Sequence, residues 1–435
     1  PAPAPSGAGL LAYAWAMPQA IEVPTTLAHA RGAYTATAHL GEHGQPAQLI
    51  LDTGSSSLVV RPHAYDPARD GCLQATPWVQ EVRYGGGAWA GPVLRSRLAF
   101  GHGHHQRRID DALFAWCETD DRLFQGADGL WGLAYRGLDP ARDASAVLAS
   151  RGHAPPLSWP WPFDDGHPLD LAAFDTFLHS LPRTLLTPAF TALEEEGVLR
   201  NCFGFAAARA VVHVAEPGAS AARLAADPLN RGTLVLGGGS EQQHLYHGGF
   251  QDVRVVHDEY YELNLRAVRV GDGQPVAVAP AAPADGEPRG NALLDTGCSL
   301  LMFDADTYAA VAAALAAIDP DFPAWIERSQ ACLARGHGLP AGDVDLSRWP
   351  DLHLLLEAPG GGEASLRLAT SRLWARNAPA PGECLCLLAP PPAAFRDRSL
   401  LGLPVLAGRY AIFDRSAGQG LGRVRFARGR EASRC

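Results

Sequence analysis

The sequence predicts a mostly β protein built from two related lobes. Its 435 residues exceed the size at which a single hydrophobic core usually stops growing. Much of the chain consists of short apolar runs bounded by Gly, Pro, Asp and Asn, as at 233–236, 261–270 and 409–414, which is typical of strands and turns. One motif, an apolar run ending in Asp-Thr-Gly, occurs twice, which indicates an internal duplication.

The two copies of this motif have similar surroundings. The first reads Leu-Ile-Leu-Asp-Thr-Gly-Ser-Ser at 49–56, and the second reads Ala-Leu-Leu-Asp-Thr-Gly-Cys-Ser at 292–299. Each copy is followed downstream by a second pattern, Gly-Leu-Trp-Gly-Leu at 129–133 and Leu-Leu-Gly-Leu at 400–403. Because the order is the same in both halves, we expect each lobe to contribute one aspartate, Asp52 or Asp295.

Lobe boundaries follow from these landmarks. We expect an N-terminal extension over 1–27, an N-terminal lobe over 28–210, a connection over 211–249 and a C-terminal lobe over 250–435. Helical patterns are few, chiefly at 188–196 and 307–317. A Pro- and Trp-bearing stretch at about 139–186 fits neither strand nor helix, and we interpret it as a surface insertion.

Composition and charge exclude several classes of protein. A formal net charge of -10 argues against nucleic acid or an anionic membrane as a partner. No run approaches the roughly 18 apolar residues of a spanning helix, so we expect no membrane segment.

Eight cysteines without zinc-finger spacing favour disulfides and a secreted or lumenal location, whether extracellular, vacuolar, endosomal or periplasmic. The chain begins at Pro1 rather than Met, which leaves a removed signal, a removed pro-segment or an artificial boundary as alternatives.

Two aspartates held together support a specific chemistry. Carboxyl groups within hydrogen-bonding distance cannot both ionise, so such a pair keeps one proton over a broad pH range. The ionised member can take a proton from an attacking water while the protonated member polarises a carbonyl, and neither a metal nor a cofactor is needed. Gly54 and Gly297 allow the tight turns, and the Ser55 hydroxyl is placed to brace Asp52.

Further motifs follow in a fixed order. They are Val-Arg-Tyr-Gly-Gly-Gly-Ala-Trp at 82–89, Ala-Asp-Gly-Leu-Trp-Gly-Leu-Ala-Tyr at 127–135, Thr-Pro-Ala-Phe at 187–190, Thr-Leu-Val-Leu-Gly-Gly at 233–238, Leu-Tyr-His-Gly at 245–248 and Tyr-Ala-Ile-Phe-Asp at 410–414. With both Asp-Thr-Gly motifs, this set resembles the pepsin family of aspartic proteases, from about Tyr34 to Ala427. In several details it is similar to the β-secretase branch of that family.

The resemblance implies a bilobal pepsin-like fold with the active-site cleft between the lobes. It implies an aspartic endopeptidase that cleaves extended polypeptides between hydrophobic side chains at acidic pH, with Asp52 and Asp295 as the catalytic pair. Thr53 and Thr296 would make hydrogen bonds across the lobes. A monomer made as a zymogen is the corresponding expectation for the whole protein.

The same resemblance assigns a flap, the hairpin that closes over bound peptide. Tyr84 takes the position over the substrate, and Gly85 and Gly86 in the glycine run after it predict a mobile tip. Pepsin holds this tyrosine with a tryptophan soon after its first motif, where this chain has Val59. We expect Trp89 to take over that role, as in the β-secretase branch.

Cysteines raise two further questions. Cys298 stands where the family has a hydroxyl. Because a thiol is a weaker donor, we expect a weaker hydrogen bond to Asp295 and a shifted pH profile of activity. The alternative is that Cys298 is a small buried residue without effect on catalysis. Family position suggests disulfides Cys332–Cys384 and Cys202–Cys435, and a weaker inference pairs Cys72 with Cys117. Cys386 and Cys298 would then be free.

Two other interpretations compete with these. A pepsin-fold binding or inhibitor protein without proteolysis is the alternative function, since fold alone does not fix function. The run His-Gly-His-His at 102–105 could suggest a metal, but it lacks a nearby acidic or Cys companion, and an exposed turn between strands is the preferred interpretation.

Overall fold

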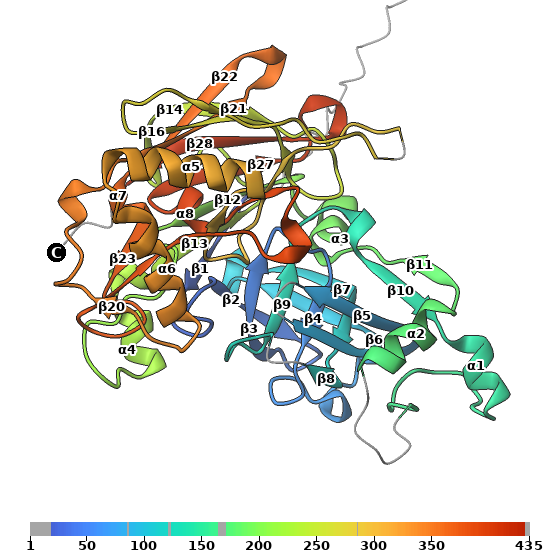
Figure 1. Cartoon of the computed structure of the whole chain (residues 1–435). Coiled ribbons are helices and arrows are strands. Elements are labelled where there is room, and N and C mark those ends of the chain that lie inside the picture. The colour runs from blue at the N-terminus through green and yellow to red at the C-terminus, as the bar shows by residue number, and fades with distance from the viewer. Residues whose placement is uncertain (1–18, 85–86, 121–122, 164–170, 285, 431–435) are drawn as a thin grey trace, which may run out of the picture.

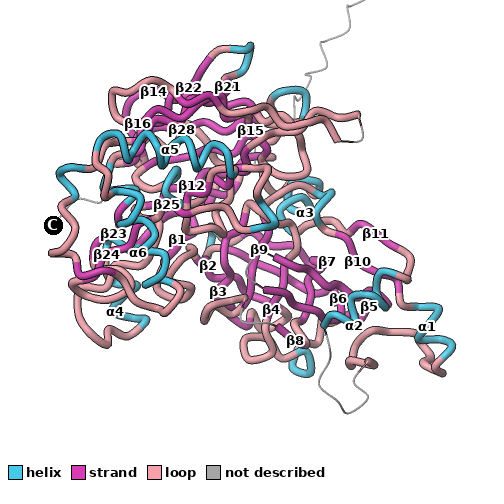
Figure 2. Tube along the Cα trace, in the orientation of Figure 1, coloured by secondary structure: helices cyan, strands magenta, loops and turns pink. Residues whose placement is uncertain are grey.

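The computed structural model describes residues 19–84, 87–120, 123–163, 171–284 and 286–430 (Figure 1). Strands dominate over short helices throughout this part of the chain (Figure 2). The prediction of a mostly β protein is therefore confirmed.

The N-terminal half carries the elements that surround the first motif. They are β1 (Ile21–Thr26), β2 (Thr35–Leu40), β3 (Gln45–Asp52), β4 (Leu58–Val60), β5 (Gln74–Tyr84), β6 (Gly87–Phe100), β7 (Arg107–Trp116), β8 (Thr119–Asp120), β9 (Gly129–Gly132), β10 (Pro140–Asp143), α1 (Ser145–Ser150), α2 (Leu171–His179), β11 (Arg183–Leu185), α3 (Ala189–Glu195) and β12 (Cys202–Ala207).

The C-terminal half carries more helix. Its elements are α4 (Ala221–Ala226), β13 (Arg231–Leu236), β14 (Tyr246–Arg254), β15 (Glu262–Leu263), β16 (Leu265–Val270), β17 (Val276–Ala277), β18 (Ala292–Leu294), β19 (Leu301–Met302), α5 (Ala305–Ile318), α6 (Phe322–Leu333), β20 (Leu339–Pro340), β21 (Leu352–Glu357), β22 (Glu363–Leu368), α7 (Thr370–Leu373), β23 (Trp374–Arg376), β24 (Glu383–Cys386), β25 (Leu388–Ala389), β26 (Ser399–Leu401), α8 (Leu403–Leu406), β27 (Arg409–Asp414) and β28 (Arg423–Gly429).

Strands of the N-terminal half close into a ring. The hydrogen-bonded order runs β6–β7–β4–β9–β3–β2, and β2 pairs back with β6. Side chains that point inward fill this ring, and the rings of Phe100 and Trp131 stack there with centroids 3.8 Å apart. A closed ring of this kind leaves no exposed sheet edge around β3 and holds the end of that strand rigidly.

A shared sheet joins the two halves. Its order is β1–β13–β12–β27–β28–β14, all antiparallel, so that strands from the beginning, middle and end of the chain lie side by side (Figure 1). The main hydrophobic core continues through it from one half to the other, since Phe203 packs between Phe190 and Phe413. This sheet fixes the positions of the two motifs relative to each other.

The duplication seen in the sequence is also present in the structure. In the N-terminal half β3 runs parallel to β9, and β4 runs antiparallel to β9. In the C-terminal half β18 runs parallel to β26, and β19 runs antiparallel to β26. The second sequence pattern therefore supplies, in each half, the strand that lies beside the Asp-Thr-Gly strand.

The segment at 139–186 differs from the expectation that it contains neither strand nor helix. Among its described residues it forms β10, α1, α2 and β11, and β10 extends the main sheet beside β5. Phe163, Phe174 and Leu178 are buried against Val79 of β5 and Ala90 of β6. The apolar side chains of this segment thus form a small separate hydrophobic core, which packs on the hairpin β5–β6.

Candidate active site

Each aspartate lies at the end of its strand, opposite a glycine of the neighbouring segment of the sheet. Asp52 is the last residue of β3, and its partner in β9 is Gly132. A methyl group at Gly132 would lie 2.4 Å from Ser56 Cα, and one at Gly402 would lie 2.4 Å from the Cys298 carbonyl oxygen. Only glycine permits such close backbone approach, so the second pattern in each half allows the Asp-Thr-Gly loop to fold tightly over it.

Reciprocal hydrogen bonds connect the two loops. The Thr53 amide donates to Thr296 Oγ1 at 3.0 Å, and the Thr296 amide donates to Thr53 Oγ1 at 2.9 Å. Each hydroxyl in turn donates across the boundary, Thr53 to the Leu294 carbonyl at 2.8 Å and Thr296 to the Leu51 carbonyl at 2.7 Å. These four bonds are buried, so they hold the loops in one register.

The two carboxyl groups are adjacent as a result. A methyl group at Gly54 would lie 2.9 Å from Asp295 Cγ, and one at Gly297 would lie 2.6 Å from Asp52 Oδ1. The side chains of Asp52 and Asp295 are close enough for the charge of Asp52 to raise the pKa of Asp295, and Asp52 is only 4% exposed. Both glycines are needed here because any side chain would collide with a carboxylate.

The two carboxyls have different surroundings. Asp52 accepts from the Gly54 amide at 2.8 Å and from the Ser55 hydroxyl, whereas Asp295 accepts from the backbone at Gly297 and Cys298. Burial raises the pKa of both groups, and the negative charge of Asp52 raises the pKa of Asp295 further. Ionisation of one carboxyl thus disfavours ionisation of the other.

Cys298 does not brace Asp295 with its thiol. Its Sγ lies 3.5 Å from the Leu300 carbonyl oxygen and 3.4 Å from the Leu300 amide, which turns it toward its own loop. Burial raises the pKa of the thiol to about 12, so it is protonated. Ser55 and Cys298 occupy the same place in the two motifs, yet only the serine donates a side-chain hydrogen bond to its aspartate.

The flap residues lie above the N-terminal loop. Tyr84 ends β5, and Trp89 lies in β6, fully buried beside Val59 and packed close to Tyr84. Burial, followed by the charge of Asp52, raises the pKa of Tyr84, while Ser55 and Trp89 lower it. Even so, neither the Tyr84 hydroxyl nor Trp89 Nε1 has a well-formed hydrogen bond within the described chain. Gly85 and Gly86 lie outside the described residues.

A buried polar network below the flap was not anticipated from the sequence. Asp139, 4% exposed, accepts from Ser57 Oγ and from Gln80 Nε2, both at 2.8 Å. Ser57 follows the first motif and Gln80 lies in β5, so this carboxyl ties the active-site loop to the base of the flap. Burial raises the pKa of Asp139 to about 6. Its signal in the sequence was weak, since Asp139 stands alone four residues after Tyr135.

The segment at 139–186 also reaches the flap through charged groups. Glu81 of β5 lies beside Asp175 of α2, and burial, followed by this neighbouring carboxyl, raises the pKa of Glu81 to about 7. Arg83 Nε is 2.9 Å from Glu81 Oε1, and His179 Nδ1 is 2.9 Å from Asp175 Oδ1. The back of the flap is therefore attached to α2.

On the C-terminal side, Tyr260 adds a partly buried side chain to the site. It packs in a small cluster with Leu293, Cys298 and Leu300. Burial raises the pKa of Tyr260, and the nearby charges that act on it include the carboxylate of Asp52. The pair of tyrosines at 260–261 gave no indication of this position in the sequence.

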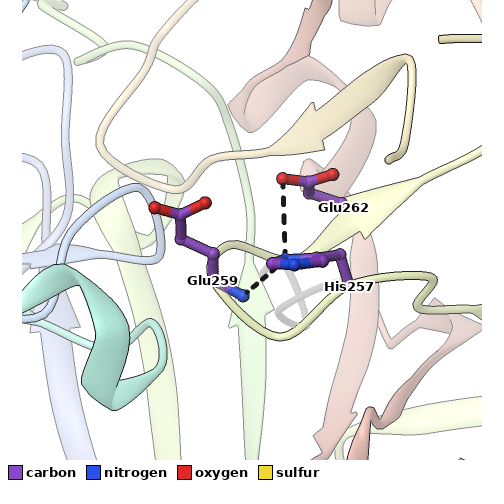
Figure 3. A group of neighbouring side chains, drawn as sticks. All are labelled: His257, Glu259 and Glu262. Carbon is purple, nitrogen blue, oxygen red and sulfur yellow. Dashed lines mark hydrogen bonds and ion pairs between the residues drawn. The ribbon is translucent and has the colours of Figure 1, made fainter. Parts of the chain in front are cut away.

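A group of three potential metal ligands lies elsewhere, at His257, Glu259 and Glu262 (Figure 3). Arg289 already supplies a cation there, because its Nη1 is 3.1 Å from His257 Nδ1, 2.6 Å from Glu259 Oε2 and 3.2 Å from Glu262 Oε1. The geometry is that of a structural ion-pair cluster, and we assign no metal to it.

The disulfide predictions are not supported by the structure. Free thiols are found at Cys72, Cys298, Cys332, Cys384 and Cys386, so neither Cys332–Cys384 nor Cys72–Cys117 is formed. Cys435 lies outside the described residues, so Cys202–Cys435 stays a prediction.

Comparison with known proteins finds a similarity in the C-terminal half of the chain. The model of the eukaryotic aspartyl protease family matches residues 219–427, which include the second Asp-Thr-Gly motif. Over these residues, just under half of the chain, the sequence is similar to the eukaryotic aspartyl proteases. A search of curated proteins found no match. Among the described residues, no helix has the length and apolar character needed to cross a membrane.

Proposed function

We propose that this protein is an aspartic endopeptidase in which Asp52 and Asp295 act together on a water molecule. The ionised Asp52 takes a proton from the water as it attacks the carbonyl of a peptide bond. Asp295 polarises the carbonyl oxygen with its own proton and then protonates the leaving nitrogen. The similarity of residues 219–427 to a peptidase family supports the general activity, and the assignment of residues is our own.

The observation that carries the proposal is the pair of reciprocal Thr53–Thr296 hydrogen bonds. They bring two carboxyls from opposite halves together in a buried setting, where one proton must serve both. Because the charge of one aspartate disfavours ionisation of the other, the singly protonated state should be populated at acidic pH. An acidic optimum follows from this reasoning.

We further propose an extended polypeptide as the substrate, bound between the lobes under the flap. Tyr84 on one side and Tyr260 on the other give this region an aromatic character. Such surroundings favour hydrophobic side chains next to the cleaved bond. A secreted or lumenal location, action as a monomer and production as a zymogen belong to the same proposal.

A digest of a peptide library between pH 3 and 8 tests this function, with and without a hydroxyl-bearing transition-state analogue. Cleavage at internal bonds that is strongest at acidic pH and abolished by the analogue is the expected result. Binding of the peptides without cleavage at any pH would favour the non-proteolytic alternative. Cleavage that the analogue leaves unchanged would refute the role of the two aspartates.

A further inference from the structure

Asp139 is a buried carboxyl that the proposed chemistry does not use. Its backbone is fixed on both sides, since its amide donates to the Arg136 carbonyl at 3.1 Å and its carbonyl accepts from the Leu186 amide at 2.9 Å. Its side chain lies between the loop of the first motif and the flap strand β5. The carboxyl is therefore a fixed point from which both of these segments can be held.

On one side, Asp139 reaches the loop that carries Asp52. Ser57 Oγ donates to Asp139 Oδ1 at 2.8 Å, and the Ser57 carbonyl accepts from the Gly132 amide at 2.9 Å. Gly132 is the partner of Asp52 in the parallel pair β3–β9. The bond to Ser57 thus acts on a firmly held part of the loop, two residues after the Ser55 hydroxyl that donates to Asp52.

On the other side, Asp139 reaches the strand that ends in Tyr84. Gln80 Nε2 donates to Asp139 Oδ1 at 2.8 Å and to the Pro140 carbonyl at 3.1 Å. Gln80 and Tyr84 lie four residues apart in β5, so their side chains are on one face of the strand. Burial, followed by the charge of Asp52 and then by that of Asp139, raises the pKa of Tyr84. The Tyr84 side chain is therefore within electrostatic reach of both carboxyls.

The two faces of β5 have different charged neighbours. On the face toward Asp139, the titratable groups are Tyr84 and, at the end of β3, Asp52, and the two side chains that donate to Asp139 are neutral. The charged Glu81 and Arg83 alternate with these positions and belong to the opposite face, toward α2. The position of β5 over the active site is therefore fixed from the Asp139 side by neutral hydrogen bonds.

We propose that Asp139 is a positioning residue, which fixes Tyr84 over the two aspartates by holding β5 and the first loop at one oxygen atom. The inference rests on the proposed function, because it concerns how a peptide is held against Asp52 and Asp295. Both donors meet at Oδ1, so a displacement of β5 relative to the loop lengthens at least one of the two bonds. Losing one buried hydrogen bond of about 1 kcal/mol shifts such an equilibrium about fivefold.

Peptide kinetics at acidic pH test this role, with Asp139→Ala, Asp139→Asn and, as the control, a change at an exposed ion pair, Glu216→Gln. Asp139→Ala should raise KM about fivefold, while kcat falls by less because Asp52 and Asp295 stay in place. Asp139→Asn should restore KM, since its amide oxygen still accepts both bonds. The active enzyme is counted with the transition-state analogue, so a loss of folded protein alone leaves KM unchanged.

The pH dependence of KM separates positioning from packing. Burial raises the pKa of Asp139 to about 6, and a buried carboxylate favours states of the chain in which water reaches it. The KM of the unaltered chain should therefore rise between about pH 5 and 7, whereas that of Asp139→Asn should stay level. An equal rise in both proteins would contradict the role of Asp139.

Amide hydrogen exchange measures the same effect without any cleavage. Relative to the intrinsic rate, exchange at 53–57 and 80–84 should be about fivefold faster in Asp139→Ala than in the unaltered chain, with β12 and β27 as reference strands for overall folding. If Asp139→Ala does not fold, Gln80→Met removes the bond on the flap side alone and should raise both KM and exchange in β5. Unchanged exchange in the folded variant, or equal effects of Asp139→Ala and Asp139→Asn, would refute the positioning role. Absence of cleavage by the unaltered chain would refute the proposed activity only.

Discussion

Replacing Cys298 with serine should restore to Asp295 the contact that Ser55 makes with Asp52. The two residues occupy equivalent places in the motifs, three residues after each aspartate. At present the Cys298 thiol lies against Leu300. A serine has nearly the same volume but a stronger donor, and we expect it to turn toward the carboxyl.

The size of the effect follows from the hydrogen bond gained. A hydrogen bond to a charged group contributes about 1.5–3 kcal/mol, and one pKa unit corresponds to about 1.4 kcal/mol. Stabilising the Asp295 carboxylate lowers its pKa, so the proton required for activity is lost at lower pH. The alkaline limb of the activity profile should therefore move down by about one pH unit or more.

The assay is the pH dependence of kcat/KM for cleavage of one peptide by the unaltered chain, Cys298→Ser and Cys298→Ala. The alanine variant is the control, because the thiol makes no contact with Asp295 to be lost. Its alkaline limb should stay within a few tenths of a pH unit of the unaltered chain. An unmoved limb in the serine variant, or equal shifts in both variants, would refute the reasoning.

Three further predictions concern the supports of the site. Thr296→Ala removes two buried hydrogen bonds and should lower stability by about 1–3 kcal/mol together with kcat/KM, whereas Thr296→Ser should retain both in denaturant unfolding and peptide assays. Burial raises the pKa of Asp139 to about 6, so the native state binds this proton more tightly than the unfolded chain does. The free energy of unfolding should therefore fall by about 2–3 kcal/mol as pH rises from about 4 to 6. Asp139→Asn should abolish that fall, and an unchanged pH dependence in the variant would contradict the prediction. Since the pKa of Glu81 is raised to about 7, the proton it shares with Asp175 is lost above that pH, and hydrogen exchange in β5 and α2 should then quicken in the unaltered chain but not in Glu81→Gln.

The sequence predicted those features that depend on local pattern. The repeat of Asp-Thr-Gly and the glycines downstream of each copy led to two similar lobes, because close backbone contacts require glycine at fixed places. The helices expected at 188–196 and 307–317 are present as α3 and α5. These signals are local in the chain, so a single sequence reveals them.

Features that depend on contacts between distant residues were missed. α6 was not anticipated, although its Pro323 stands in the first turn, where proline is favourable. The packing of 139–186 on the flap joins residues of α2 to β5, which no spacing in the sequence relates. Asp139 likewise acquires its partners Ser57 and Gln80 only through folding. The predicted Cys332–Cys384 and Cys72–Cys117 disulfides were wrong, because Cys72, Cys332 and Cys384 remain thiols.

The proposed activity depends on Asp52 and Asp295 acting as a pair that shares one proton. The most direct measurement is kcat/KM at acidic pH for Asp52→Asn and Asp295→Asn. Asp110→Asn is the control, since the Asp110 side chain is 63% exposed and pairs with Arg97 and Arg108. Each site variant should lose at least about a thousandfold, within the range assigned to a positioned acid or base, and the control should keep full activity. Substantial cleavage by either site variant, still blocked by the transition-state analogue, would contradict the shared-proton mechanism.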